Sequence, residues 1–81
     1  MNLEALQGAR CVIGVKQVTK ALKRGSVACI FVAEDAEESV AGPLRELAGE
    51  QGIELQRAAS MKELGAACGI EVGAAAAAVL K

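Results

Sequence analysis

The cations of one short segment are the residues of this sequence best suited to bind a ligand. Between Gly14 and Gly25 the basic side chains recur at offsets of four, seven and eight positions, at Lys16, Lys20, Lys23 and Arg24. In a helix this spacing places them on one face, while Val15, Val18 and Leu22 share another. Because the free amides at the start of a helix favour anions, a helix that begins at Gly14 predicts a site for phosphate.

The basic charge is concentrated in one region of the chain. Residues 10–25 contain five of the nine Lys and Arg residues and no acid, with Arg10 as the first, although the formal net charge is -1. A solvated helix face would also carry lysines. The clustering in a chain that is not basic overall favours contact with a nucleic acid.

The absence of histidine from the sequence excludes histidine-dependent nucleophiles, proton shuttles and metal ligands. Phe31 is the single aromatic residue, so bases cannot be stacked on an aromatic platform. The cysteines Cys11, Cys29 and Cys68 form no CxxC pair, and we interpret them as reduced thiols. A small enzyme that uses Glu37 with a divalent cation, or Cys68 as nucleophile, is the weakest of our hypotheses. We expect a protein that is not an enzyme and has no cofactor.

A chain of 81 residues, with 53% hydrophobic and 23% charged residues, predicts one compact domain over residues 1–81. Its first residues lack the layout of a signal peptide, and its apolar runs are shorter than the roughly 20 residues that cross a bilayer. We therefore expect a cytoplasmic protein that does not contact membranes. No long exposed apolar stripe demands a partner, so a monomer is expected.

The elements that must position the cations follow from the hydrophobic pattern. Continuous apolar runs predict buried strands at residues 11–13 and 28–33, and alternation predicts a half-exposed edge strand at 53–58. A last strand is expected at Ala74 to Leu80, despite its alanines. The alternation of strands and helices predicts an α/β fold, a three-layer α/β/α sandwich.

Helices are predicted in the remaining segments. One is the basic helix; another, at the N-terminus, would use Leu3, Ala5 and Leu6 and end near Gly8. Because proline is favoured only in a first turn, Gly42-Pro43 predicts a helix that begins at Pro43 and ends at Gly52. Ser60 to Glu63 is a capping box that predicts a helix ending at Gly69.

The acidic run Glu34, Asp35, Glu37, Glu38 could in principle hold Mg²⁺, since hard cations prefer carboxylates. The chain has no glycine-rich loop that would hold a phosphorylated substrate beside such a cation. We interpret the run as a solvated helix start, with Glu37 as the exception given below, and expect no metal site.

Three segments carry a resemblance to a known family: GVKQVTKALKRG at 14–25, VAEDAEES at 32–39 and SMKELGAACGIEVGAAA at 60–76. With them the chain resembles the ribosomal L-seven-Ae family, and most closely its short bacterial members that bind kink-turn RNA. The resemblance implies a mixed four-stranded sheet inside the sandwich. It also implies non-catalytic recognition of sharply bent RNA with sheared G·A pairs, in a riboswitch, ribosomal RNA or other transcript.

The resemblance also assigns the site. Bases would be read by the start of the basic helix, at Gly14, Lys16, Gln17 and Lys20. Archaeal and eukaryotic members carry Asn-Glu where this chain has Lys16-Gln17, and Lys can donate to guanine O6 and N7. An extruded nucleotide would lie near Glu37 under the loop Ile70, Glu71, Val72, Gly73 and Ala74. Lys23 and Arg24 complete the predicted RNA-binding set. The alternative is a structural ribosome-associated protein that binds ribosomal RNA without selecting kinks.

Overall fold

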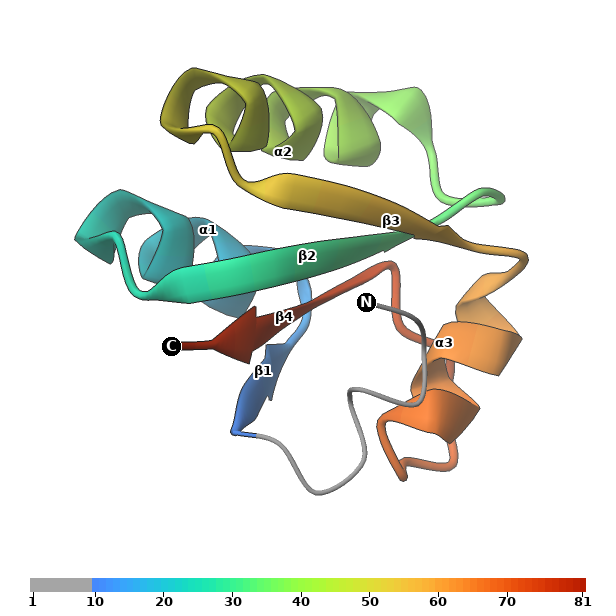
Figure 1. Ribbon diagram of the computed structural model, residues 1–81. Helices are drawn as coiled ribbons and strands as arrows, with labels where there is room; N and C mark the ends of the chain where they lie inside the picture. Colours follow the sequence, from blue (N-terminus) through green and yellow to red (C-terminus); the bar gives the residue numbers. More distant parts are fainter. Residues whose placement is uncertain (1–9) are drawn as a thin grey trace.

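The computed structural model describes residues 10–81, so the helix expected near residues 3–8 lies outside the described residues (Figure 1). In chain order the elements are β1 (Cys11–Ile13), α1 (Val15–Arg24), β2 (Val27–Ala33), α2 (Glu38–Gln51), β3 (Glu54–Ala58), α3 (Met61–Ala67) and β4 (Ala76–Leu80). Strands and helices alternate along the chain, as the hydrophobic pattern predicted.

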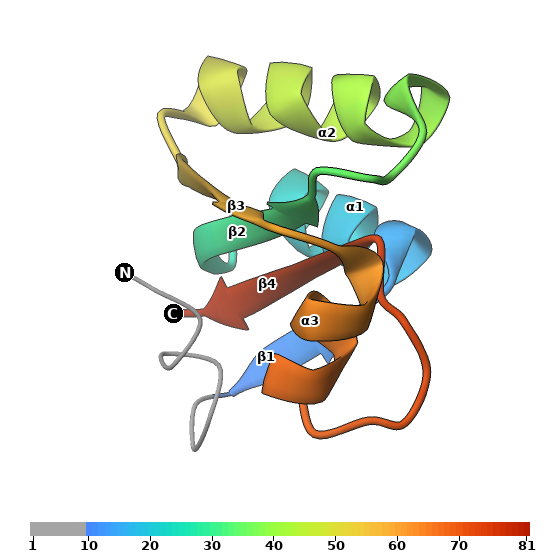
Figure 2. The ribbon, with the colours of Figure 1, turned by 90° about the vertical axis from the view of Figure 1, so that its right-hand side faces the viewer.

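The four strands form one mixed sheet in the order β1-β4-β2-β3. β2 pairs with β3 in parallel, whereas β4 is antiparallel to both of its neighbours, β1 and β2. Helices α1 and α2 cover one face and α3 covers the other, as Figure 2 shows. The three-layer α/β/α sandwich with a mixed four-stranded sheet is confirmed.

The basic helix forms as its periodicity predicted. On the inner face of α1, Val18 and Leu22 are fully buried against the sheet and α2. The helix ends at Gly25, where a φ of 72° allows the Gly25 amide to donate to the Leu22 carbonyl at 3.0 Å. The cations of this helix are all exposed to solvent, at Lys16, Lys20, Lys23 and Arg24.

The predicted start of α2 at Pro43 is wrong, because the helix begins five residues earlier, at Glu38. A proline ring usually clashes with the Cβ of the preceding residue, but here that residue is Gly42, which has none. Pro43 also leaves the carbonyl of Ser39 without its helical donor, and Ser39 is exposed, so water can take that place. The predicted end at Gly52 is correct.

The alanine-rich strand β4 occupies the centre of the sheet, between β1 and β2. Ala76, Ala77 and Ala78 are fully buried, on both faces of the strand. Pairing on two sides outweighs the helix propensity of alanine, and small side chains let α1 pack closely on this strand. The last strand is thus confirmed, although it starts two residues later than predicted.

Two other local predictions hold. β3 lies at the edge of the sheet, as its alternating pattern indicated. The hydroxyl of Ser60 accepts a hydrogen bond from the amide of Glu63 at 3.0 Å, which caps the start of α3.

None of the helices in residues 10–81 has both the length and the apolarity needed to cross a membrane.

Candidate functional site

Three segments meet at one end of the sheet, which we call the site end. β1 and β2 finish there, at Ile13 and Ala33, and the antiparallel β4 starts there, at Ala76. The first turn of α1, the acidic turn at residues 34–37 and the loop at residues 70–75 all leave the sheet at this end. Figure 2, which looks onto the site end, shows this loop below the start of α1.

Backbone hydrogen bonds hold the start of α1 and the end of β2 to two adjacent residues of the chain. The Gly14 amide donates to the Ala76 carbonyl, and the Ala33 amide donates to the Ala75 carbonyl, each at 2.9 Å. The chain has to turn sharply at Gly14, where φ is 99° and ψ is 151°, a conformation that only glycine adopts readily. The predicted glycine-led start of the basic helix is therefore held in the site end by a backbone hydrogen bond.

The polar residues at the start of α1 point to solvent. Lys16 and Gln17 are exposed in the first turn, and Lys20 is exposed one turn later. The first turn contains no acidic residue, so the partial positive charge of the helix N-terminus is not offset within the helix. This arrangement can hold an anion beside a hydrogen-bonding amide side chain.

The loop at residues 70–75 is held close to α3. The Ile70 amide donates to the Gly65 carbonyl at 3.1 Å, and the Ala74 amide donates to the Met61 carbonyl at 3.0 Å. A Cβ on Gly65 would lie 2.1 Å from the Val72 carbonyl oxygen, so only glycine fits there. The loop thus has its position set by backbone contacts with α3.

Within this loop the predicted contact residues divide into two groups. Val72 is 68% exposed, an unusual exposure for a large apolar side chain, and Glu71 and Gly73 are exposed beside it. Ile70 is half-buried and Ala74 is 4% exposed, because both pack into the core under α3. The loop therefore presents Glu71, Val72 and Gly73 to a ligand, while Ile70 and Ala74 anchor it.

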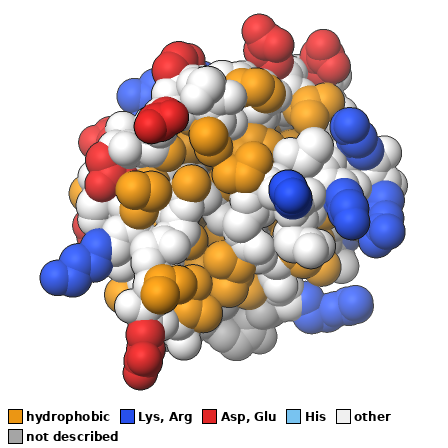
Figure 3. Space-filling model, turned by 180° about the vertical axis from the view of Figure 1, so that it is seen from behind, with side chains coloured by type: hydrophobic (Ala, Val, Ile, Leu, Met, Phe, Trp, Pro, Cys, Tyr) orange, Lys and Arg blue, Asp and Glu red, His pale blue; other side chains and the backbone are white. Residues whose placement is uncertain are grey.

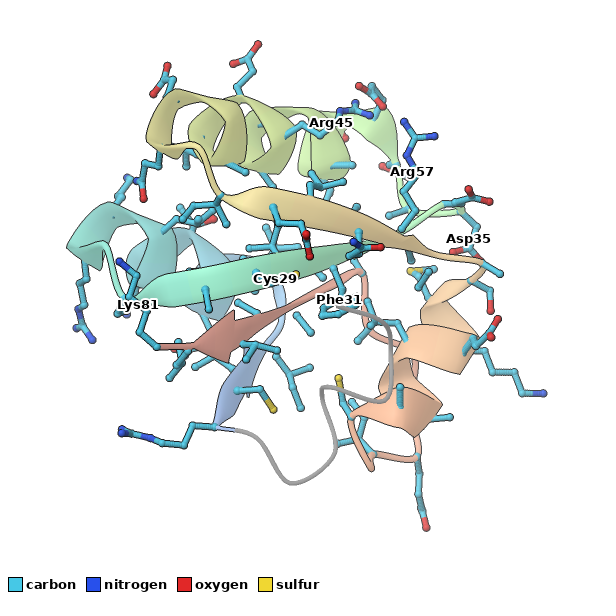
Figure 4. All side chains as sticks on the ribbon, in the orientation of Figure 1. Cys29, Phe31, Asp35, Arg45, Arg57 and Lys81 are labelled. Atoms are coloured by element: carbon cyan, nitrogen blue, oxygen red, sulfur yellow. The ribbon has the colours of Figure 1, made fainter. Side chains whose placement is uncertain are left out.

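The acidic turn completes the site end. Glu37 is exposed at the N-cap of α2, and the Ser39 hydroxyl donates to its carboxylate at 3.5 Å. The neighbouring Asp35 accepts a hydrogen bond from the Met61 amide at 2.8 Å, and Figure 4 shows it beside the start of α3. Asp35 thereby ties the turn to α3.

This role of Asp35 was not foreseen, since the acidic run was interpreted as solvated apart from Glu37. The two partners are 26 residues apart, and no local spacing connects them. The only available signal was the position of the aspartate in the turn shared with the family.

The remaining predicted cations do not lie at the site end. Lys23 and Arg24 are in the last turn of α1, about 10 Å along the helix from Lys16 at 1.5 Å per residue. Figure 3 shows most of the visible Lys and Arg side chains toward one side of the molecule and others on the opposite side, with hydrophobic side chains in the middle of that face. The structure thus spreads the predicted basic face over the full length of α1.

The acidic turn also borders a hollow of about 170 Å³ between α2 and β3. Its charged lining consists of Glu34, Glu38, Arg45 and Arg57, and Arg45 forms an ion pair with Glu38. Figure 4 shows Arg45 and Arg57 on the two sides of this hollow. Two cations and two anions give it no net preference for an anion.

The chemistry of the acids and thiols does not favour catalysis. Within residues 10–81 no three His, Cys, Asp or Glu side chains are grouped so that they could hold a metal. Burial, and then a nearby Cys11, raises the pKa of Cys68, which disfavours its nucleophilic thiolate. Burial, with hydrogen bonding to Glu54, raises the pKa of Cys29 to about 11. All three cysteines are free thiols, and Cys11 and Cys68 are half-buried.

Comparison with known sequences gives the family. The sequence profile of the ribosomal protein L7Ae/L30e/S12e/Gadd45 family matches residues 3–81. The chain belongs to this family. The resemblance to the L-seven-Ae proteins is therefore confirmed.

Individual relatives of this L7Ae-family chain carry two kinds of name. An "RNA-binding protein" of Bacillus pumilus is 50% identical over 74 residues, covering 91% of this chain and 90% of its own. "RNA-binding protein YbxF" of Geobacillus stearothermophilus is 42% identical over 78 residues, covering 96% and 95%. "Large ribosomal subunit protein eL8" of Halobacterium salinarum is 47% identical over 83 residues, covering 96% of this chain and 69% of its own.

Solved structures give the same fold. The "15.5kD RNA binding protein" of Giardia lamblia matches with a TM-score of 0.83 at 25% identity, over 98% of this chain and 65% of its own. A protein of unknown function from Bacillus halodurans matches with a TM-score of 0.86 at 24% identity, over 98% and 83%, and supports the fold alone.

Proposed function

We propose that this protein is a non-catalytic RNA-binding protein that recognises and stabilises kink-turn RNA through its site end. Membership of the L7Ae family and the names of the relatives, RNA-binding protein and large ribosomal subunit protein, support a non-catalytic RNA binder. The observation that carries the kink selectivity is the meeting of three segments around Ala75 and Ala76: the start of α1, the acidic turn and the loop at residues 70–75.

A kinked target fits this geometry for a physical reason. Regular A-form RNA has a major groove too narrow for side chains to read, so a helix needs a site where bending or non-standard pairs open the groove. In the proposed complex the start of α1 enters this opened groove. Lys16 and Lys20 donate to guanine edges or phosphates there, and the amide of Gln17 hydrogen-bonds to a base edge.

The other two segments would receive the nucleotide that the kink extrudes. The exposed Val72 offers apolar contact without an aromatic ring, and the carboxylate of Glu37 can accept a hydrogen bond from a base. By binding the bent form more tightly, the protein shifts the RNA ensemble toward it. No covalent step is involved.

The proposal is tested by binding two RNAs of equal length, a kink-turn and a fully paired duplex, at the same salt concentration. The kink-turn should bind at least about 1,000-fold more tightly, the lower end of the range that specific protein–DNA sites show over non-specific ones. Fluorescence energy transfer between dyes on the two RNA arms should report bending when protein is added. Equal affinity for the two RNAs would contradict the kink selectivity.

Lys20 provides a point test of the site. Lys20→Ala should weaken binding to the kink-turn at least about 10-fold, because a charge-assisted hydrogen bond is worth about 1.5–3 kcal/mol. It should also lower the log–log salt slope by about 0.7–0.9 if one phosphate contact is lost. Fluorescence anisotropy over a salt series measures both quantities.

The matched control is Lys62→Ala, which removes an exposed lysine from α3 on the opposite face of the sheet. This control should bind like the unchanged protein. A Lys20→Ala protein that also binds unchanged would remove Lys20 from the interface.

A second candidate function is supported by the 47% identity to a large ribosomal subunit protein. The protein would then be a structural ribosome-associated protein that holds ribosomal RNA without selecting kinks. Co-sedimentation with ribosomal subunits at high salt, together with equal affinity for kinked and straight RNA, would favour this function over the first.

A further inference from the structure

We propose that a second group of cations, at the opposite end of the sheet, binds the phosphate backbone of the helical stem that adjoins the kink. We call this group the basic end: Arg10, Lys23, Arg24 and Lys81. The inference rests on the proposed function and adds a separate contact surface to it. The sequence pattern had grouped Lys23 and Arg24 with the start of α1 and had left Lys81 out.

Tertiary hydrogen bonds bring the basic end together from three chain segments. The Leu80 amide donates to the Arg10 carbonyl at 2.8 Å, which holds the start of β1 beside the end of β4. The Lys81 amide donates to the Ser26 carbonyl at 2.9 Å, next to the turn that follows α1. Figure 4 shows the Lys81 side chain beside this turn.

The charges of the basic end are not neutralised by the fold. All four side chains are exposed, and none of them forms an ion pair with a residue in the described part of the chain. Lys23 and Arg24 offset the negative end of the α1 dipole, but Arg10 and Lys81 are not on that helix. Helix stability therefore does not explain why four cations converge here.

Continuity with α1 indicates what the basic end binds. The exposed Lys20 lies between the site end and the basic end, so the cations run along the whole of α1. An RNA stem that contacts the first turn of α1 and runs along the helix would reach Lys23 and Arg24 about 10 Å further on, at 1.5 Å per residue. Lys and Arg without neighbouring aromatic side chains suit phosphates, which position an RNA without reading its sequence.

The test uses kink-turn RNAs that share one kink but differ in stem length. One RNA has both stems short, and two others have one stem each extended by about one helical turn. The unchanged protein should bind one extended RNA about 5- to 10-fold more tightly than the short RNA. The double variant Arg10→Gln/Lys81→Gln should lose this gain, and its salt slope on that RNA should fall by about 1.4–1.8, for two phosphate contacts.

The control is Arg57→Gln/Lys62→Gln, which removes the same net charge from exposed positions on β3 and α3. This control should keep the stem-length gain, and circular dichroism should show that both variants fold. Equal affinities of the unchanged protein for all three RNAs, or an equal loss in the control, would overturn the proposal.

The two proposals fail in different ways. If kinked and straight RNAs bind equally, the proposed kink recognition fails. The effect of Arg10→Gln/Lys81→Gln on a straight duplex then still tests the basic end by itself. If kinked RNA is preferred but stem length has no effect, only the basic end is wrong.

Discussion

Replacing Gly65 with alanine should lower stability and RNA affinity together. The new Cβ would lie 2.1 Å from the Val72 carbonyl oxygen and 3.2 Å from the Gly73 Cα, so the loop at residues 70–75 must move. Overpacking against backbone typically costs about 1–3 kcal/mol, and this contact lies at the upper end. For a domain of this size a loss of about 3 kcal/mol lowers the Tm by about 12–24 °C.

Thermal denaturation gives the change in stability, and kink-turn binding below the lowered Tm gives the change in the site. The proposed function predicts that binding falls about 10-fold or more, because the loop no longer faces the extruded nucleotide. A variant that is destabilised but binds with unchanged affinity would show that the loop is not part of the interface.

Gly49 offers a control of opposite sign. It lies in the same kind of element, inside α2, but no described atom beyond its chain neighbours and its own helix backbone comes within 4 Å of its added Cβ. Gly49→Ala should therefore raise the stability by about 0.5–1 kcal/mol, because alanine loses less backbone entropy in a helix. Its RNA affinity should be unchanged.

Replacing Gly14 with alanine should produce the second large effect. At a φ of 99° and a ψ of 151° a side chain is strained by about 1–3 kcal/mol, although no described atom beyond the chain neighbours of Gly14 lies within 4 Å of the added Cβ. Relief of the strain would disturb the hydrogen bond from the Gly14 amide to the Ala76 carbonyl. The first turn of α1 would then change its direction relative to the sheet. We expect a lower Tm and at least a 10-fold loss of kink-turn affinity.

Gly52 is the matched control, since it also has a positive φ, 67°, but lies at the far end of α2. Its left-handed conformation is one that asparagine tolerates, so Gly52→Asn should cost less than about 1 kcal/mol and leave RNA binding unchanged. If Gly14→Ala behaves like this control, the geometry at Gly14 does not matter for the site.

The local elements of this protein were largely predictable from its sequence. The two faces of α1, with Val18 and Leu22 on the buried face and the lysines on the exposed face, follow from the spacing of neighbouring residues in the sequence. This prediction was confirmed. The cap of α3 at Ser60 is equally local. The wrong start of α2 has a local cause as well, because the rule for proline was applied without allowing for the missing Cβ of Gly42.

Tertiary pairing decided the features that local rules leave open. The alanines of β4 form a strand because neighbours on both sides complete their hydrogen bonds, an effect that helix propensity cannot include. The bond between Asp35 and the Met61 amide joins residues far apart in the chain, so no spacing rule could find it.

The sequence by itself determined that one helix carries a basic face and starts at a glycine, since side-chain type and helical period are properties of the chain alone. Only the tertiary structure decided how that face is used. Because β4 runs antiparallel between β1 and β2, it brings residues 70–75 to the start of α1 and Lys81 to its end. Strand direction, which no local pattern encodes, therefore decides which other segments lie beside each end of this predicted row of cations.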